Sequence, residues 1–112
     1  MANTFKSRHL KDVSNSSAET LLQADSGSQV ILIGLQLSNT GSSEVKASVV
    51  LNNSADSDTG EMTLLNLLPI PAYSMVSVLV GDKIVMEQSD ILKILSDTAS
   101  SLNAVVSYLD ID

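Results

Sequence analysis

The chain has 112 residues and a formal net charge of −7, a length that leaves room for one domain and argues against two. It contains no cysteine, which excludes disulfide bonds, thiolate metal sites and a cysteine nucleophile. No apolar signal segment opens the sequence, and no apolar run approaches the roughly 18 residues of a membrane span. We therefore expect a soluble protein that is made in the cytoplasm and does not enter a membrane.

Charge is divided unevenly along the chain. Residues 1–11 hold Lys6, Arg8 and Lys11 and no acid, whereas the rest holds thirteen acids and three lysines, a local net charge of −10. Such an acidic body is a poor partner for nucleic acid, which needs a basic surface. The basic start leaves two interpretations open, an arm that docks on an acidic neighbour or a first strand that shows its polar face to water.

The first elements along the chain are extended. Residues 1–13 are polar with three apolar positions, which predicts an extended arm or an edge strand. Residues 18–24 are predicted to form a strand after the loop Asn15-Ser16-Ser17.

The next two segments are the clearest strands. Residues 29–38 are predicted to form a central strand that is covered on both faces. Alternation assigns one face to Ile31, Ile33, Leu35 and Leu37, and the other face to Val30 and Leu32. Residues 44–52 alternate cleanly, as a half-buried antiparallel strand does. The inward positions of this second strand are Val45, Ala47, Val49 and Leu51.

The second half of the chain continues this pattern. Residues 61–68 are predicted to form a strand, and the prolines at positions 69 and 71 assign it to an edge or a crossing segment. Residues 74–80 and 83–87 are predicted to form a hairpin around Gly81-Asp82. The last two strands are expected at residues 91–95 and 103–111, joined by a loop at 96–101.

These elements predict an all-β fold. Seven to nine strands about eight to twelve residues apart are typical of a single antiparallel β-sandwich, either a jelly roll or an Ig-like domain. The expected organisation is an N-terminal arm or edge strand at residues 1–13 and a β-sandwich domain at residues 14–112. The core must be aliphatic because only three aromatic residues occur, and we expect Tyr108 to pack in the core or at an interface.

No motif predicts catalysis, a metal or a cofactor. The acidic segment at residues 56–61 resembles a Ca²⁺ loop, but its twelfth position is Leu67 instead of a bidentate Glu. His9 is the only histidine, and neither a G-x-S-x-G elbow nor a glycine-rich phosphate loop accompanies it. We expect a protein that is not an enzyme and binds no cofactor.

Five segments carry a resemblance to a known family when they are taken in order. They are IGLQLSNT at 33–40, which is followed by EVKASV at 44–49, then LPIPA at 68–72, VGDKIVME at 80–87, SDTASS at 96–101 and VVSYL at 105–109. This order resembles a group of small β-sandwich virion proteins of tailed bacteriophages, over roughly residues 29–111. The resemblance implies a non-enzymatic structural protein of the virion, present in multiple copies. It leaves the place in the particle open between capsid decoration, a neck or collar, and a tail or fibre attachment, and we favour capsid decoration.

The expected partners are further copies of the chain and other virion proteins. Sandwich edges offer unpaired backbone groups for strand addition, and residues 1–13 are long enough, at about 3.3 Å per residue, to cross a neighbouring subunit. We therefore expect a homo-oligomer, a trimer or a ring. The candidate interface residues are Phe5, Lys6, Arg8, Leu10 and Lys11. Deletion of residues 1–13 is then expected to leave a folded monomer. A carbohydrate- or receptor-binding module is the alternative, although the low aromatic count argues against it.

Overall fold

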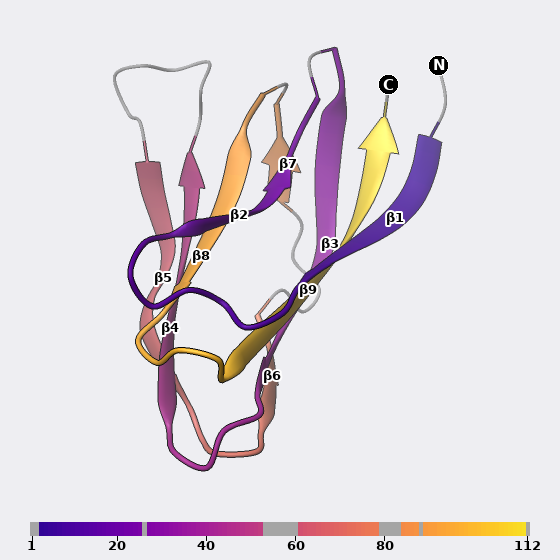
Figure 1. Cartoon of the computed structure of the whole chain (residues 1–112). Coiled ribbons are helices and arrows are strands. Elements are labelled where there is room, and N and C mark those ends of the chain that lie inside the picture. The colour runs from indigo at the N-terminus through magenta and orange to yellow at the C-terminus, as the bar shows by residue number, and fades with distance from the viewer. Residues whose placement is uncertain (1–2, 26, 53–60, 79–83, 88, 112) are drawn as a thin grey trace.

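The computed structural model describes residues 3–25, 27–52, 61–78, 84–87 and 89–111, which form two antiparallel sheets that face each other (Figure 1). The strands are β1 (Asn3–Leu10), β2 (Glu19–Gln23), β3 (Gln29–Asn39), β4 (Val45–Asn52), β5 (Glu61–Ile70), β6 (Met75–Ser77), β7 (Ile84–Met86), β8 (Ile91–Ser96) and β9 (Leu102–Ile111). These ranges contain no helix, and so none that is long and apolar enough to cross a membrane. The predicted all-β sandwich is confirmed.

The strand order is that of a jelly roll. The first sheet has the order β1-β9-β3-β6 with β7 also paired to β3, and the second sheet has the order β2-β8-β4-β5. Because β9 occupies one edge of β3, the short β6 and β7 together fill one strand position on the other edge. When β6 and β7 are counted as one strand, β1 pairs with β9, β2 with β8, β3 with β6 and β7, and β4 with β5. An Ig-like domain instead pairs its first strand with its second.

The core between the sheets is aliphatic, as predicted. Along β4 the inward positions are buried and alternate with exposed or half-buried ones, which confirms the predicted orientation of this strand. Tyr108 is 7% exposed and packs in the core from β9. Each fully buried Val, Leu or Ile side chain stabilises the fold by roughly 1.5–3 kcal/mol. The sandwich therefore rests on many aliphatic contacts of similar size.

The predicted faces of β3 are wrong because the strand contains a β-bulge. The register between β3 and β9 shifts just after Leu32, where one extra residue enters β3. One extra residue reverses the alternation, so Leu35 lies on the same face as Leu32 while Ile33 is 37% exposed. The predicted cover on both faces is also wrong, because Ile31 is only half-buried on the outer side. The buried side chains of this strand are Val30, Leu32, Leu35, Leu37 and Asn39.

The predicted hairpin of residues 74–80 and 83–87 is not found among the described residues of this segment. β6 and β7 each pair with β3, through Val76 opposite Leu37 and Val85 opposite Ile31, instead of with each other. A two-stranded hairpin alone is marginal in water, whereas the eleven-residue β3 offers both segments a partner edge. The predicted turn Gly81-Asp82 lies outside the described residues, as do residues 56–60 of the acidic segment.

Prolines mark an edge, as the sequence indicates. β5 is the outermost strand of the second sheet, and it continues through Pro69 to Ile70, two residues beyond its predicted end. An edge strand tolerates proline because its outward N–H groups need no partner. The strand at 91–95 and the strand at 103–111 are also observed, each within one residue of the prediction.

Hydrogen bonds join distant turns at one end of the sandwich. Asn39, 2% exposed at the end of β3, donates from Nδ2 to the carbonyl oxygens of Ser43, Ile70 and Pro71 at 2.8, 3.0 and 3.2 Å. Its Oδ1 atom accepts a hydrogen bond from the backbone N–H of Gly41 at 2.9 Å. This buried amide therefore has a partner for both of its polar atoms.

The turn at residues 96–101 belongs to the same end. The backbone N–H of Thr40 donates to the carbonyl oxygen of Ser101 at 2.8 Å. Asp97 exchanges two hydrogen bonds with the backbone of Lys46, accepting through Oδ1 at 2.9 Å and donating from its N–H at 3.0 Å. Three of the five segments singled out in the sequence, at 33–40, 68–72 and 96–101, thus meet here, and their polar residues hold the turns together.

Candidate assembly surface

β1 is the long edge strand of the first sheet. All eight of its residues pair with β9 in an unbroken register from Asn3 opposite Ile111 to Leu10 opposite Ala104. Figure 1 shows β1 beside β9 at the margin of the sheet. Its side chains are exposed except for Leu10, which is half-buried. Residues 3–10 therefore form an edge strand of the sheet, which is one of the two predicted alternatives.

The direction of the backbone groups of β1 follows from two neighbouring hydrogen bonds. Val13 N donates to the carbonyl oxygen of Leu102, so the even-numbered residues of β9 point their backbone groups toward β1. Thr40 N donates to the carbonyl oxygen of Ser101, so the odd-numbered ones point toward β3. In an antiparallel ladder, directly opposite residues are bonded or unbonded in alternation. We infer that alternate β1 residues direct their N–H and C=O groups outward, namely Asn3, Phe5, Ser7 and His9.

The other edges of the sandwich are shorter or interrupted. β2 has five residues and a register shift after Thr20. β5 contains Pro69 and, at Leu67, a positive φ of 55° within an irregular register. β6 and β7 have three residues each. Because bulges, prolines and short length protect sheet edges from pairing, β1 is the described edge best suited to accept another strand.

The five predicted interface residues do not share one face. Lys6, Arg8 and Leu10 are two positions apart along the strand and point toward the inner side of the sheet. Phe5 points to the outer side and is 77% exposed. Lys11 lies just beyond the strand and is exposed. The structure thus divides the predicted set between a cationic inner side and an apolar outer side.

An ion pair marks the cationic side of β1. Lys6 Nζ lies 2.9 Å from Asp110 Oδ2, with the Lys6 side chain 46% exposed and the Asp110 side chain 13% exposed. Asp110 Oδ1 is buried and has no hydrogen-bond partner among the described residues. The pair anchors β1 to the C-terminal part of β9. Arg8 lies two residues further along the same side, exposed to solvent.

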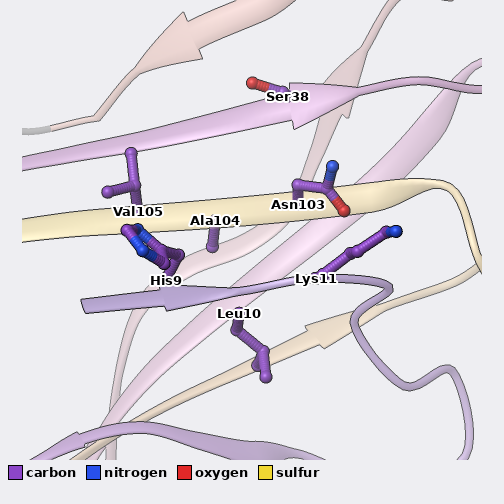
Figure 2. A pocket seen from close by; sticks show the side chains of 7 residues that line it. All are labelled: His9, Leu10, Lys11, Ser38, Asn103, Ala104 and Val105. Carbon is purple, nitrogen blue, oxygen red and sulfur yellow. The ribbon is translucent and has the colours of Figure 1, made fainter.

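A shallow depression of about 230 Å³ lies at the other end of β1, shown in Figure 2. Its polar side chains come from three strands and include His9, Ser38 and Asn103. Within the described ranges no hydrogen bond joins His9 to Ser38, and Asn103 Oδ1 accepts from the backbone N–H of Asp12 at 2.9 Å. The depression therefore lacks the hydrogen-bonded nucleophile and base that acyl transfer needs. No cluster of three metal-binding side chains occurs in the same ranges.

A second hollow of about 210 Å³ lies between the sheets, with aliphatic side chains only around it. Leu64, Leu65, Val78 and Ile84 line its open side. With no polar group to orient a ligand, this hollow offers apolar contact alone.

Comparisons with known proteins find a structure of similar fold and identify no family. No protein-family model matches the chain, and no curated protein matches it. Among solved structures, the chain resembles one described under "Bacillus endospore appendages form a novel family of disulfide-linked pili". The TM-score is 0.56 at 13% sequence identity, over 97% of this chain and 87% of that one. A likeness at this identity shows a shared fold and nothing finer.

Sequence reasoning missed the neighbours of Phe5 on the outer side. Leu109, Ile31 and Val85 lie in register with it across the sheet. No sequence signal groups them, because they are far apart in the chain and only the strand order aligns them.

Proposed function

We propose that this chain is a non-enzymatic structural subunit of a tailed bacteriophage virion, present in multiple copies and acting as a capsid decoration protein. The observation that carries the proposal is the free, regular edge of β1 on a rigid jelly roll. Copies associate when this edge accepts a strand from a neighbour, through the outward backbone groups of residues such as Phe5 and Ser7. Further copies and other virion proteins are its partners.

The charges beside the β1 edge indicate which kind of strand would pair with it. Lys6 and Arg8 flank the inner side of the edge, so a strand with acidic residues on that side is favoured over a basic one. Two β1 strands paired with each other would place cations side by side in most registers. The chain has thirteen acids against six Lys and Arg residues, so another part of a second copy supplies the complementary charge.

Two further observations support the proposal. Jelly rolls occur in viral capsid proteins, which is an argument by fold analogy. The order of the five resemblance segments agrees with small β-sandwich virion proteins.

Three alternatives use the same features. A neck, collar or tail-fibre attachment protein would use the β1 edge in another place of the particle. A pilus-like filament subunit is favoured by the fold of the endospore appendage structure, but a disulfide link is impossible within a chain that has no cysteine. A carbohydrate- or receptor-binding module is favoured by the use of jelly rolls in lectins.

Particle composition tests the proposed place, and one backbone substitution tests the edge. Mass spectrometry of purified phage particles should find the chain in many copies, and electron microscopy should place it on the capsid. Absence from particles, or localisation to the tail, would reject the decoration role, and binding on a glycan array would favour the lectin alternative.

Ser7→Pro removes an outward N–H and leaves the ladder with β9 intact, whereas Ser7→Ala keeps that N–H. We expect Ser7→Pro to abolish binding to the particle and Ser7→Ala to preserve it. Equal binding by both variants would exclude strand addition at β1.

A further inference from the structure

A row of apolar side chains crosses the outer face of the first sheet. The registers place Phe5 opposite Leu109, Leu109 opposite Ile31, and Ile31 opposite Val85. Directly opposite residues of an antiparallel pair point to the same side, and the chain neighbours of Ile31 are buried in the core. These four residues, called the outer row, therefore point away from the second sheet. Phe5 and Val85 are 77% and 52% exposed at its two ends.

The face around the outer row carries no formal charge on its strands. The charged residues within β1, β9, β3, β6 and β7 are Lys6, Arg8 and Asp110, and the alternation places all three on the opposite side. Glu87 follows β7 at the margin, where Oε2 accepts a hydrogen bond from Gln29 Nε2 at 3.1 Å. By contrast, two lysines, Lys46 and Lys93, lie at outward positions of the second sheet.

This composition differs from that of an ordinary exposed sheet face. Depletion of charge together with aromatic and aliphatic side chains marks the buried centre of protein interfaces. A charged partner surface placed on this face would lose its hydration and meet no opposite charge. The matching surface must therefore itself be uncharged and apolar.

We propose that the outer face of the first sheet packs against the same face of a second copy, forming a two-fold symmetric dimer. The chain has a net charge of −7, so two copies repel each other through most of their surfaces. Contact through this face opposes no fixed charges. The inference concerns a face and not the β1 edge, so it stands independently of the proposed function.

Two-fold symmetry allows several axis directions within the face, and we place the axis parallel to the strands because of the side-chain sizes in the outer row. A two-fold axis parallel to the strands places Phe5 of one copy over Val85 of the second copy, and Leu109 over Ile31. The largest side chain of the row then meets the smallest, which is the complementary arrangement for packed layers.

The size of the face sets the strength of the contact. Four strands about 4.8 Å apart, each with about eight residues of about 3.3 Å, cover roughly 500 Å² per copy, or about 1,000 Å² in total. This is near the lower limit for a specific interface. We therefore expect a reversible dimer that dissociates on dilution.

Sedimentation velocity of the whole chain over a dilution series tests the dimer. The wild-type protein should shift from dimer to monomer as it is diluted. Val85→Lys and Phe5→Lys should each weaken association at least tenfold. Met62→Lys is the matched control, because Met62 is 60% exposed on the edge strand of the other sheet, and it should change association less than twofold.

A charge pair tests the orientation of the axis. Combining Phe5→Lys with Val85→Glu in one chain places opposite charges over each other and should restore part of the association that either substitution removes. All of these positions are exposed, and equal thermal unfolding midpoints would show that the variants remain folded.

Three outcomes would overturn the inference. They are a wild-type protein that is monomeric at every concentration, a dimer that survives Val85→Lys, and an equal loss in Met62→Lys. Ser7 points to the same face as Phe5, so Ser7→Pro is compared with Ser7→Ala, which keeps the outward N–H. Both variants should leave the face-to-face dimer within twofold, because neither adds a charge to the face. A dimer lost in Ser7→Pro and retained in Val85→Lys would assign association to the β1 edge instead.

Discussion

Asn39 at the end of β3 donates a hydrogen bond from Nδ2 to the carbonyl oxygen of Ile70 at the end of β5, at 3.0 Å. The two residues belong to different sheets and are 31 positions apart in the chain. This contact ties the sheets together where the chain turns from one to the other. The polar residues at this end of the sandwich thus have a structural role.

Replacing Asn39 should therefore cost stability out of proportion to its size. Asn39→Ala leaves three carbonyl oxygens and the Gly41 N–H without their side-chain partner, and we expect a loss on the order of 2–4 kcal/mol. Chemical denaturation measures this. Asn103→Ala is the control, because Asn103 accepts one hydrogen bond at an exposed site and its loss should stay below about 1 kcal/mol. Equal losses would contradict the assigned role of Asn39.

Gly41 has no room for a side chain. A Cβ atom there would lie 2.8 Å from Ser101 Oγ and 3.2 Å from Ser101 Cβ. We expect Gly41→Ala to destabilise the protein by about 1–2 kcal/mol. Adding Ser101→Gly removes both atoms and should recover most of that loss in a double-mutant cycle. Gly34→Ala, where no atom lies within 4 Å, should be neutral or slightly stabilising; strictly additive effects of the first two changes would reject the clash.

The fold could be predicted from the sequence where local pattern and burial agree. The alternation of Val45 to Leu51 depends only on neighbouring residues, and the structure repeats it. Pro69 indicated an edge through the chemistry of one residue. Choosing between a jelly roll and an Ig-like sandwich was beyond the sequence, because that choice depends on which distant strands pair.

The candidate surface was predictable only in part for the same reason. Basic residues and Phe5 pointed to the N-terminal strand, but the strand divides them between two faces. Ile31 and Val85 join Phe5 only through the registers with β9 and β3. The bulge after Leu32 did have a sequence signal that the alternation argument left unused, because an isolated glycine inside a strand, here Gly34, often marks a bulge.

The bulge predicts that Leu35 contributes much more to stability than Ile33, whereas strict alternation would place both residues on one face. Leu35 is 2% exposed, whereas Ile33 is 37% exposed. Leu35→Ala should therefore cost about 2–5 kcal/mol of unfolding free energy, and Ile33→Ala about 1 kcal/mol or less. Urea denaturation of the two variants makes the comparison within one strand. Similar losses at both positions would mean that Ile33 and Leu35 share the buried face after all.

Within the N-terminal segment, Val13 is expected to contribute to folding, whereas Phe5 is expected to contribute to assembly. Val13 is fully buried, and its N–H donates to the carbonyl oxygen of Leu102 at 2.8 Å. We expect Val13→Ala to cost about 2 kcal/mol of unfolding free energy, and Phe5→Ala to cost less than about 0.5 kcal/mol because its side chain is exposed. Thermal and chemical denaturation measure both.

Deletion of residues 1–13 combines the two effects. It removes a core side chain and the strand that covers β9, so the truncated chain should lose cooperative unfolding instead of remaining a folded monomer. Circular dichroism during a thermal ramp decides this. If the truncated chain unfolded as sharply as the full chain, β1 and Val13 would be dispensable for the sandwich, and residues 1–13 would act as an arm after all.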